Sequence, residues 1–219
     1  MKNKPEKGAA EFRMFAIPDF RAQPEGNVVE GHAAVFGQSA NIGGWFHEVI
    51  QRGAFDKTDF RDVLYSACNH DSIRSHRIPL ARSRNNNANS TLQLKVDDQG
   101  LWTRASLDVE RNAEARALYS AVERGDISGM SLVMYIGEDR WEGLDTDMPT
   151  RHILAVSRVL EVTPASLPAY EGTDINTRDQ HALESAARAL ESARSRLESQ
   201  KSEQAEIRQL KDALLGRKD

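Results

Sequence analysis

Short hydrophobic runs, some continuous and some alternating with polar residues, follow one another along the first three quarters of the chain. In Thr91–Val96 two leucines and a valine fall on one face, and Gln93 and Lys95 fall on the other, which is the period of a half-buried strand. The Asp-Asp-Gln-Gly sequence that follows favours a turn, so this run and the next are predicted to form a hairpin. The predicted strands are Phe12–Ile17, Val28–Phe36, Val63–Cys68, Thr91–Val96, Leu101–Val109, Ile127–Ile136 and Ile153–Thr163.

One stretch between these strands has helical spacing instead. Ala113, Ala117 and Ala121 recur every four residues, the last two beside a leucine and a valine, and Gly125 favours a helix end. We therefore expect a helix over Asn112–Arg124. Many strands and few helices predict an α+β domain that is mainly an antiparallel β-barrel or sandwich with helices around it.

The last forty residues differ in character, because residues 179–219 contain no proline and a single glycine near the end. Leucines repeat every seven residues, and this period predicts a long amphipathic helix that could form a coiled coil. Two roles are open for it: packing on the domain or on a copy of itself, or serving as an arm that docks onto an assembly partner. The two series of seven-residue repeats are Leu183, Leu190 and Leu197, and Ala186, Ala193, Gln200, Ile207 and Leu214.

Composition narrows the class of protein. A chain of 219 residues suffices for one medium domain with an appendage, and a net charge of -4 does not mark it as a binder of nucleic acid or of anionic membranes. The only cysteine is Cys68, so an internal disulfide is excluded. No apolar run approaches the roughly 20 residues that span a bilayer. We expect a soluble intracellular protein without a membrane or nucleic-acid partner.

Two segments carry candidate chemistry of the acyl-transfer kind. His70, at the end of a predicted strand, could accept and return a proton near neutral pH, or could be structural. Ser131 lies where the turn at Gly129 runs into a buried strand, so its hydroxyl could be held rigidly; without context it could equally satisfy the turn. A serine nucleophile needs a base, and only a histidine from elsewhere in the chain can supply it.

A third candidate is Glu161, a carboxylate inside an apolar strand, where it is costly unless paired. It could orient a histidine ring, or form a salt bridge to Arg158 or Arg151. The histidines lack a zinc-binding spacing such as His-Glu-x-x-His, so no metal site and no cofactor are expected.

A set of short motifs occurs in order over Phe12–Ile175, and together they are specific. In this order they resemble the phage prohead (procapsid) maturation serine protease family. The motifs are Gly31–Phe36, Glu48–Ile50, Gly53–Phe55, Asn69–Asp71, Gly100–Leu101, Gly129–Ser131, Glu161–Thr163 and Pro168–Tyr170 with Thr173.

The resemblance implies roles for three residues: His70 as general base, Ser131 as nucleophile and Glu161 as third member of a catalytic triad. Thr163 replaces the serine of the family's Glu-Val-Ser motif. The family is distantly similar to the herpesvirus assembly proteases, whose closed β-barrel is ringed by helices and whose third member is a second histidine. His152 is therefore an alternative to Glu161.

The function implied by the resemblance is that of a serine endopeptidase with a protease domain at residues 11–175 and a helical tail at 179–219. Its implied partner is the major capsid protein with its scaffolding segment, which it would cleave, along with itself, inside the assembling procapsid in the host cytoplasm. Self-association is also open. Two other classes of function stay open: a non-enzymatic assembly scaffold or chaperone acting through the tail, and a cysteine hydrolase with Cys68 as nucleophile.

Overall fold

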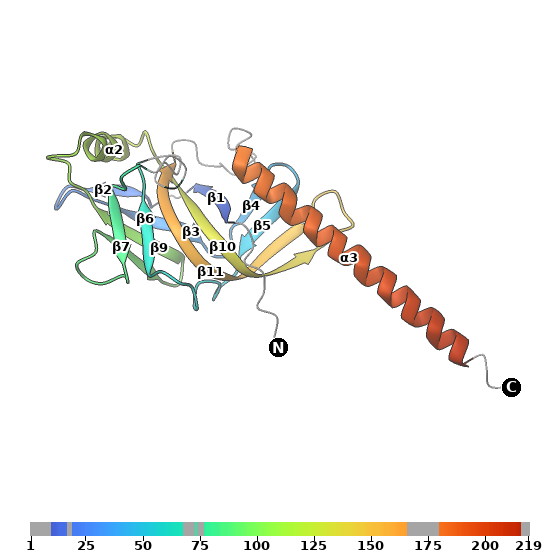
Figure 1. Ribbon diagram of the computed structural model, residues 1–219. Coiled ribbons are helices and arrows are strands. Elements are labelled where there is room, and N and C mark those ends of the chain that lie inside the picture. The colour runs from blue at the N-terminus through green and yellow to red at the C-terminus, as the bar shows by residue number, and fades with distance from the viewer. Residues whose placement is uncertain (1–9, 17–18, 68–72, 74–76, 166–179, 216–219) are drawn as a thin grey trace.

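The protein is seen in a computed structural model that describes residues 10–16, 19–67, 73, 77–165 and 180–215. Strands form one body, and a long helix projects from it (Figure 1). The elements are β1 (Glu11–Ala16), β2 (Arg21–Gln23), β3 (Val28–Val35), β4 (Ser39–Ile42), β5 (Phe46–Ile50), β6 (Asp62–Tyr65), β7 (Ala81–Arg84), β8 (Leu92–Val96), β9 (Gly100–Ser106), α2 (Ala113–Glu123), β10 (Gly129–Glu142), β11 (Thr150–Ala165) and α3 (Gln180–Leu215).

The larger sheet has seven strands and is organised around β11. Five of them follow the order β1-β10-β11-β5-β4, while β6 pairs with β11 and β7 pairs with β6. The strand β11 is antiparallel to β10 along its whole length. It also pairs in parallel with β5 near its start and with β6 near its end. Three other strands, two of them distant in the sequence, therefore meet along β11.

The smaller sheet has four antiparallel strands in the order β2-β3-β9-β8. The predicted hairpin is confirmed as β8 and β9, whose turn is closed by Asp97: its amide donates to the Gly100 carbonyl and its side chain accepts from the Gly100 amide. A Cβ atom at Gly100 would overlap the carbonyl of Ala34 on β3, so the close approach of these strands requires glycine.

The predicted α+β class is confirmed, with mostly strands and two helices among the described residues. The larger sheet is mixed rather than wholly antiparallel, because β5 and β6 run parallel to β11. The strand pairings leave both sheets open within the described residues, so the closed barrel is not confirmed. The strands β2, β4, β5 and β7 were not predicted.

The main hydrophobic core draws on both sheets and on α2. Val29 and Leu101 come from the smaller sheet, Leu132 and Val162 from the larger one, and Leu118 from the helix. The sheets are therefore held together by one shared core, with burial of apolar surface as the driving force.

The helix α2 lies within one residue of its predicted ends. Asn112 caps it by accepting hydrogen bonds from the first-turn amides, and Gly125 follows its end at φ +78°. The larger apolar side chains beside the repeated alanines form the buried face of this helix. The buried residues are Ala115, Leu118 and Val122 rather than Ala113, Ala117 and Ala121.

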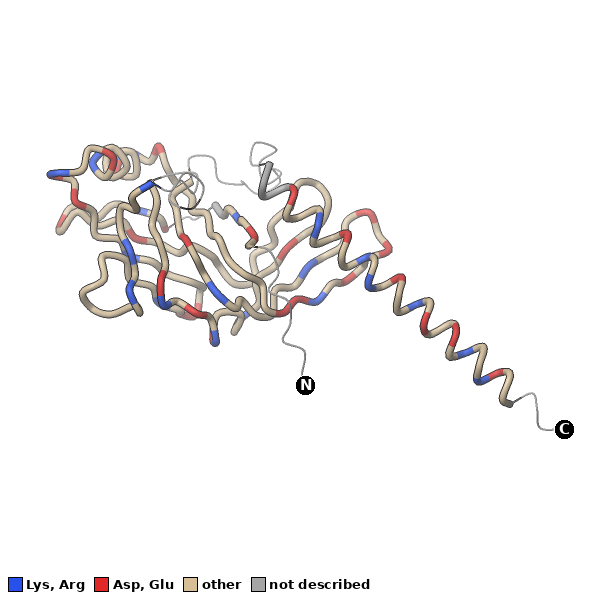
Figure 2. Tube along the Cα trace, viewed as in Figure 1, with Lys and Arg blue, Asp and Glu red and all other residues tan. Residues whose placement is uncertain are grey.

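The helix α3 is the predicted C-terminal helix, and only its first part packs on the domain. Ala186 and Leu190 form a second small core with Ile42 and Phe46 of the larger sheet. From Glu198 to Leu214 every described side chain is exposed. This distal half extends away from the body and carries acidic and basic residues along its length (Figures 1 and 2).

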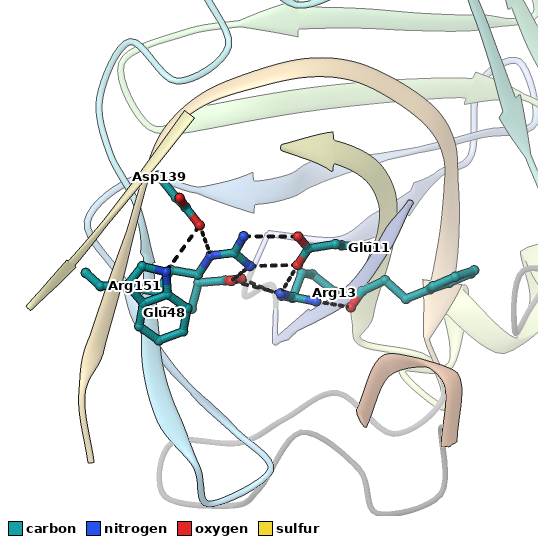
Figure 3. A network of polar contacts seen from close by, with 7 residues as sticks. Glu11, Arg13, Glu48, Asp139 and Arg151 are labelled. Carbon is teal, nitrogen blue, oxygen red and sulfur yellow. Dashed lines mark hydrogen bonds and ion pairs between the residues drawn. The ribbon is translucent and has the colours of Figure 1, made fainter. Parts of the chain in front are cut away.

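A buried ion network joins β1 to β5, β10 and β11 (Figure 3). Arg13 donates to Glu48 at 2.5 and 2.9 Å and to Glu11 at 2.5 Å. Arg151 donates to Glu11 at 2.7 and 3.0 Å, to Glu48 at 3.2 Å and to Asp139 at 2.7 Å. The side chains of the two arginines and of Glu48 are at most 4% exposed. The first strand is thus held to its neighbours by charge pairs as well as by its backbone.

The members of this network keep one another charged. Burial alone would raise the pKa of the Glu11 carboxyl, but Arg13 and then Arg151 more than offset this, and the pKa is lowered. Burial would lower the pKa of the Arg13 guanidinium, but Glu48 and Glu11 raise it further still. Removing one partner would leave a buried charge without compensation, which is costly.

Glu48→Ala should therefore lower the free energy of unfolding by about 3–5 kcal/mol, as for a broken buried ion pair. Urea unfolding followed by circular dichroism measures this. The control is Asp62→Asn, which removes the carboxylate that Arg82 contacts at 2.7 Å in a half-exposed pair. That loss should stay below about 1 kcal/mol. Equal losses in the two variants would contradict the role given to the network.

The network should also make folding sensitive to acid. Because folding lowers the pKa of Glu11 from its ordinary 4.5, its contribution is complete above that pH. The contribution is lost as the pH falls through the lowered value. The difference in unfolding free energy between the wild type and Glu11→Gln should thus shrink below pH 4.5. A difference that stays constant from pH 6 to pH 3 in urea titrations would refute this.

Candidate active site

Ser131 lies near the start of β10 and is only 2% exposed. It pairs with Met14 of β1 on one side and with Thr163 of β11 on the other. Its Oγ donates to the carbonyl of Arg13 at 2.8 Å. The predicted boundary between turn and core is confirmed, since Gly129 begins the strand. The serine is held by the same strand that the ion network anchors.

Glu161 lies on β11 and is fully buried. Its Oε1 accepts a hydrogen bond from the hydroxyl of Ser66, which directly follows β6. Thr163 donates to the carbonyl of Ser66 at 3.3 Å. Residues of β10 and β11 and the residue that follows β6 thus form one buried cluster, which we call the polar cluster: Ser66, Ser131, Glu161 and Thr163.

Strand register puts the serine and the acid on the same face of the sheet. Ser131 faces Thr163 across the ladder, and Val133 faces Glu161, with no register shift between these pairs. Side chains alternate along a strand, so Ser131 and Glu161 are diagonal neighbours on one face, at a typical Cα separation of about 7–8 Å. The opposite face at this point belongs to the hydrophobic core.

The predicted base His70 lies outside the described residues, as does Cys68. The described chain stops at Ala67, one residue beyond Ser66. The Ser66 amide donates to the Val162 carbonyl at 3.3 Å. This hydrogen bond places the segment Ser66–Ala67 beside Glu161 and Thr163 of the polar cluster.

His152, the alternative third member, lies far from the polar cluster. It is eleven residues before Thr163 on β11, which corresponds to about 36 Å of strand at roughly 3.3 Å per residue. Its Nδ1 contacts Gln51 at 3.0 Å and its Nε2 contacts Glu142 at 3.2 Å. His152 is therefore not positioned to act with Ser131.

The two arginines considered as salt-bridge partners of Glu161 face other acids. Arg151 belongs to the ion network, and the Nε of Arg158 lies 3.9 Å from the carboxylate of Asp59. The neighbour that the sequence did not single out is Ser66. Ser66 lies in a short run of small residues that gives no specific signal in the sequence. Only the pairing of β6 with β11 brings Ser66 next to Glu161.

The motif Gly31–Phe36 supplies a polar contact outside the cluster. The ring of His32 lies between two carboxylates, 2.7 Å from Asp19 and 3.0 Å from Asp97. This histidine joins the segment after β1 to the β8–β9 turn, so its role in the described fold is structural.

Across the described ranges, no three histidine, cysteine, aspartate or glutamate side chains gather as metal ligands would. The described helices also include none that combines the length and apolar character needed to cross a membrane.

Comparison with known proteins identifies the family. No curated protein and no solved structure matches the chain, so the similarity to herpesvirus proteases is not confirmed. The sequence model of the Caudovirus prohead serine proteases, in contrast, matches residues 18–187, well over half of the 219. The matched span contains the whole polar cluster, from Ser66 to Thr163. The chain belongs to the Caudovirus prohead serine protease family, whose members are serine proteases of capsid maturation.

Proposed function

We propose that Ser131 is the nucleophile of this protease, His70 its general base and Glu161 the third member of the triad. The observation that carries the proposal is the diagonal arrangement of Ser131 and Glu161 on one face of β10 and β11. Both side chains therefore lie on the side of the sheet from which one histidine ring could contact them together.

Chain connectivity supports His70 as the ring in question. Ser66 is hydrogen-bonded to Glu161. His70 follows Ser66 by four residues, so their Cα atoms can be at most about 14 Å apart even in a fully extended chain. The base is thus tethered close to the acid. Membership of a serine protease family also argues against Cys68 as the nucleophile.

The proposed mechanism is acyl transfer. His70 accepts the hydroxyl proton as the Oγ of Ser131 attacks the scissile carbonyl, and then gives that proton to the leaving amine. The carboxylate of Glu161 orients the imidazole and stabilises its protonated form. Water then hydrolyses the acyl-enzyme with His70 as base.

The hydroxyl of Ser131 is buried and already donates to a backbone acceptor in the described structure. Ser131 is 2% exposed, and its proton is directed at the Arg13 carbonyl on β1. Catalysis requires the hydroxyl to turn to the base and the surroundings of Ser131 to open.

The proposed substrates are the scaffolding segment of the major capsid protein and the protease's own ends, cleaved inside the procapsid. The family supports a role in capsid maturation, and the targets themselves are our proposal. We further propose that residues 11–175 form the protease domain and that the tail at 179–219 carries it into the particle. The exposed distal half of α3 supports this, since it packs on none of the described domain.

Ser131→Ala should abolish capsid-protein cleavage when the protease is co-expressed with its cognate major capsid protein. Mass spectrometry of the assembled particles reads out truncated capsid protein. The control Ser157→Ala removes a hydroxyl that is also bonded to a carbonyl, that of Tyr135, but away from the polar cluster. It should cleave normally. Full cleavage by Ser131→Ala would instead favour a scaffold or chaperone role and would overturn the proposed function.

Deleting residues 198–219 should reduce incorporation of the protease into procapsids without changing its melting temperature, because the described side chains that it removes, those of 198–214, are all exposed. Immunoblots of purified particles and thermal unfolding measure the two effects. As a control, Leu190→Asp keeps the tail but disturbs the contact with Phe46, so it should lower the melting temperature. Normal incorporation and maturation with the truncated chain would disprove the docking role.

A further inference from the structure

Ser66 makes three contacts with three successive residues of β11. Its amide donates to the carbonyl of Val162 at 3.3 Å, its hydroxyl donates to Oε1 of Glu161, and its carbonyl accepts from the hydroxyl of Thr163 at 3.3 Å. It is only 1% exposed. Hydrogen bonds of both the backbone and the hydroxyl therefore fix the position of Ser66.

We propose that Ser66 is a positioning residue that acts through Glu161, an inference that rests on the triad proposed above. The hydroxyl holds one carboxylate oxygen, so that the carboxylate plane is set and the second oxygen is directed to the histidine ring. Ser66 does not touch the substrate or the reacting atoms in this scheme.

The physical need for such a residue follows from the length of glutamate. Its side chain has one more torsion than aspartate, and its last torsion is broad, so the backbone alone does not fix the carboxylate plane. A hydroxyl that donates to an ionised carboxylate forms a short, directional hydrogen bond. Triad geometry is sensitive, because a misplacement of about 1 Å can cost roughly 100-fold in rate.

Thr163 extends the same arrangement toward the nucleophile. It donates to the Ser66 carbonyl and lies directly across the ladder from Ser131. Ser66 thus contacts both the acid and the residue that pairs with the nucleophile, and these two residues are separated by only Val162 on β11. A displacement of Ser66 would therefore act directly on the Glu161 carboxylate and only indirectly, through Thr163, on Ser131.

The test is the rate at which a fluorophosphonate reacts with the full-length protein, measured per folded molecule. The Oγ of Ser131 would displace fluoride from phosphorus as the base takes the proton, so this rate reports activation of the nucleophile without peptide recognition. Ser66→Ala should slow the reaction roughly 10- to 100-fold. Ser83→Ala is the matched control: it removes another fully buried hydroxyl, on β7, which accepts from the Asn86 amide. It should lower the melting temperature and leave the rate unchanged.

A double-mutant cycle separates positioning from stability. If Ser66 acts through Glu161, then Ser66→Ala should have little further effect on the rate in a Glu161→Gln background. Additive losses in the cycle, or a lower melting temperature with an unchanged rate, would overturn the proposal. Should Ser66→Ala fail to fold, Ser66→Cys carries the test, since it keeps the volume and donates only weakly; a wild-type rate for that variant would also overturn it.

Failure of this inference is distinguishable from failure of the proposed function. If Ser131→Ala is still labelled, Ser131 is not the nucleophile and the proposed triad is wrong. If labelling requires Ser131 but not Ser66, the proposed triad still holds and only the positioning role of Ser66 is refuted.

Discussion

The pairing of β11 with β6 and β10 is the constraint on which the candidate site depends. Backbone hydrogen bonds fix the register of Ser131 against Thr163 and of Glu161 against Leu64. A slip of one residue in either ladder would turn every side chain of the shifted strand to the other face of the sheet. The polar side chains of that strand would then point into the hydrophobic core, and the polar cluster would not form. The proposed chemistry is thus a consequence of strand register, with the serine, the acid and the positioning hydroxyl brought together from three strands.

The ion network extends this constraint to β1. Among the four side chains of that strand whose burial is described, Glu11 and Arg13 are buried and Phe12 and Met14 are only partly buried, the reverse of what hydrophobicity alone indicates. The charges are tolerated because each has partners on neighbouring strands (Figure 3). Since the carbonyl of Arg13 also accepts from Ser131, the network bears on the state of the proposed nucleophile as well as on stability.

Sequence patterns found the strands that contain longer apolar runs and missed four short strands in which polar residues interrupt the apolar ones. The β8–β9 hairpin and the limits of α2 were predicted because alternation, turn residues and capping are local signals. The strand β5 was missed because Glu48 occupies a buried position, and β7 because Ser83 does. Ser131 and Glu161 were singled out by family motifs, but their shared face, and the role proposed for Ser66, depend on pairings between distant segments that no local pattern encodes.

The most direct measurement is a crystal structure of the wild-type protein in which the side chain of His70 is defined by electron density. The account predicts one ring nitrogen within about 3.2 Å of the Ser131 hydroxyl or turned toward it, and the other within the same distance of the Glu161 carboxylate. A ring that packs on the opposite face of the sheet, with another side chain filling the space between Ser131 and Glu161, would contradict it.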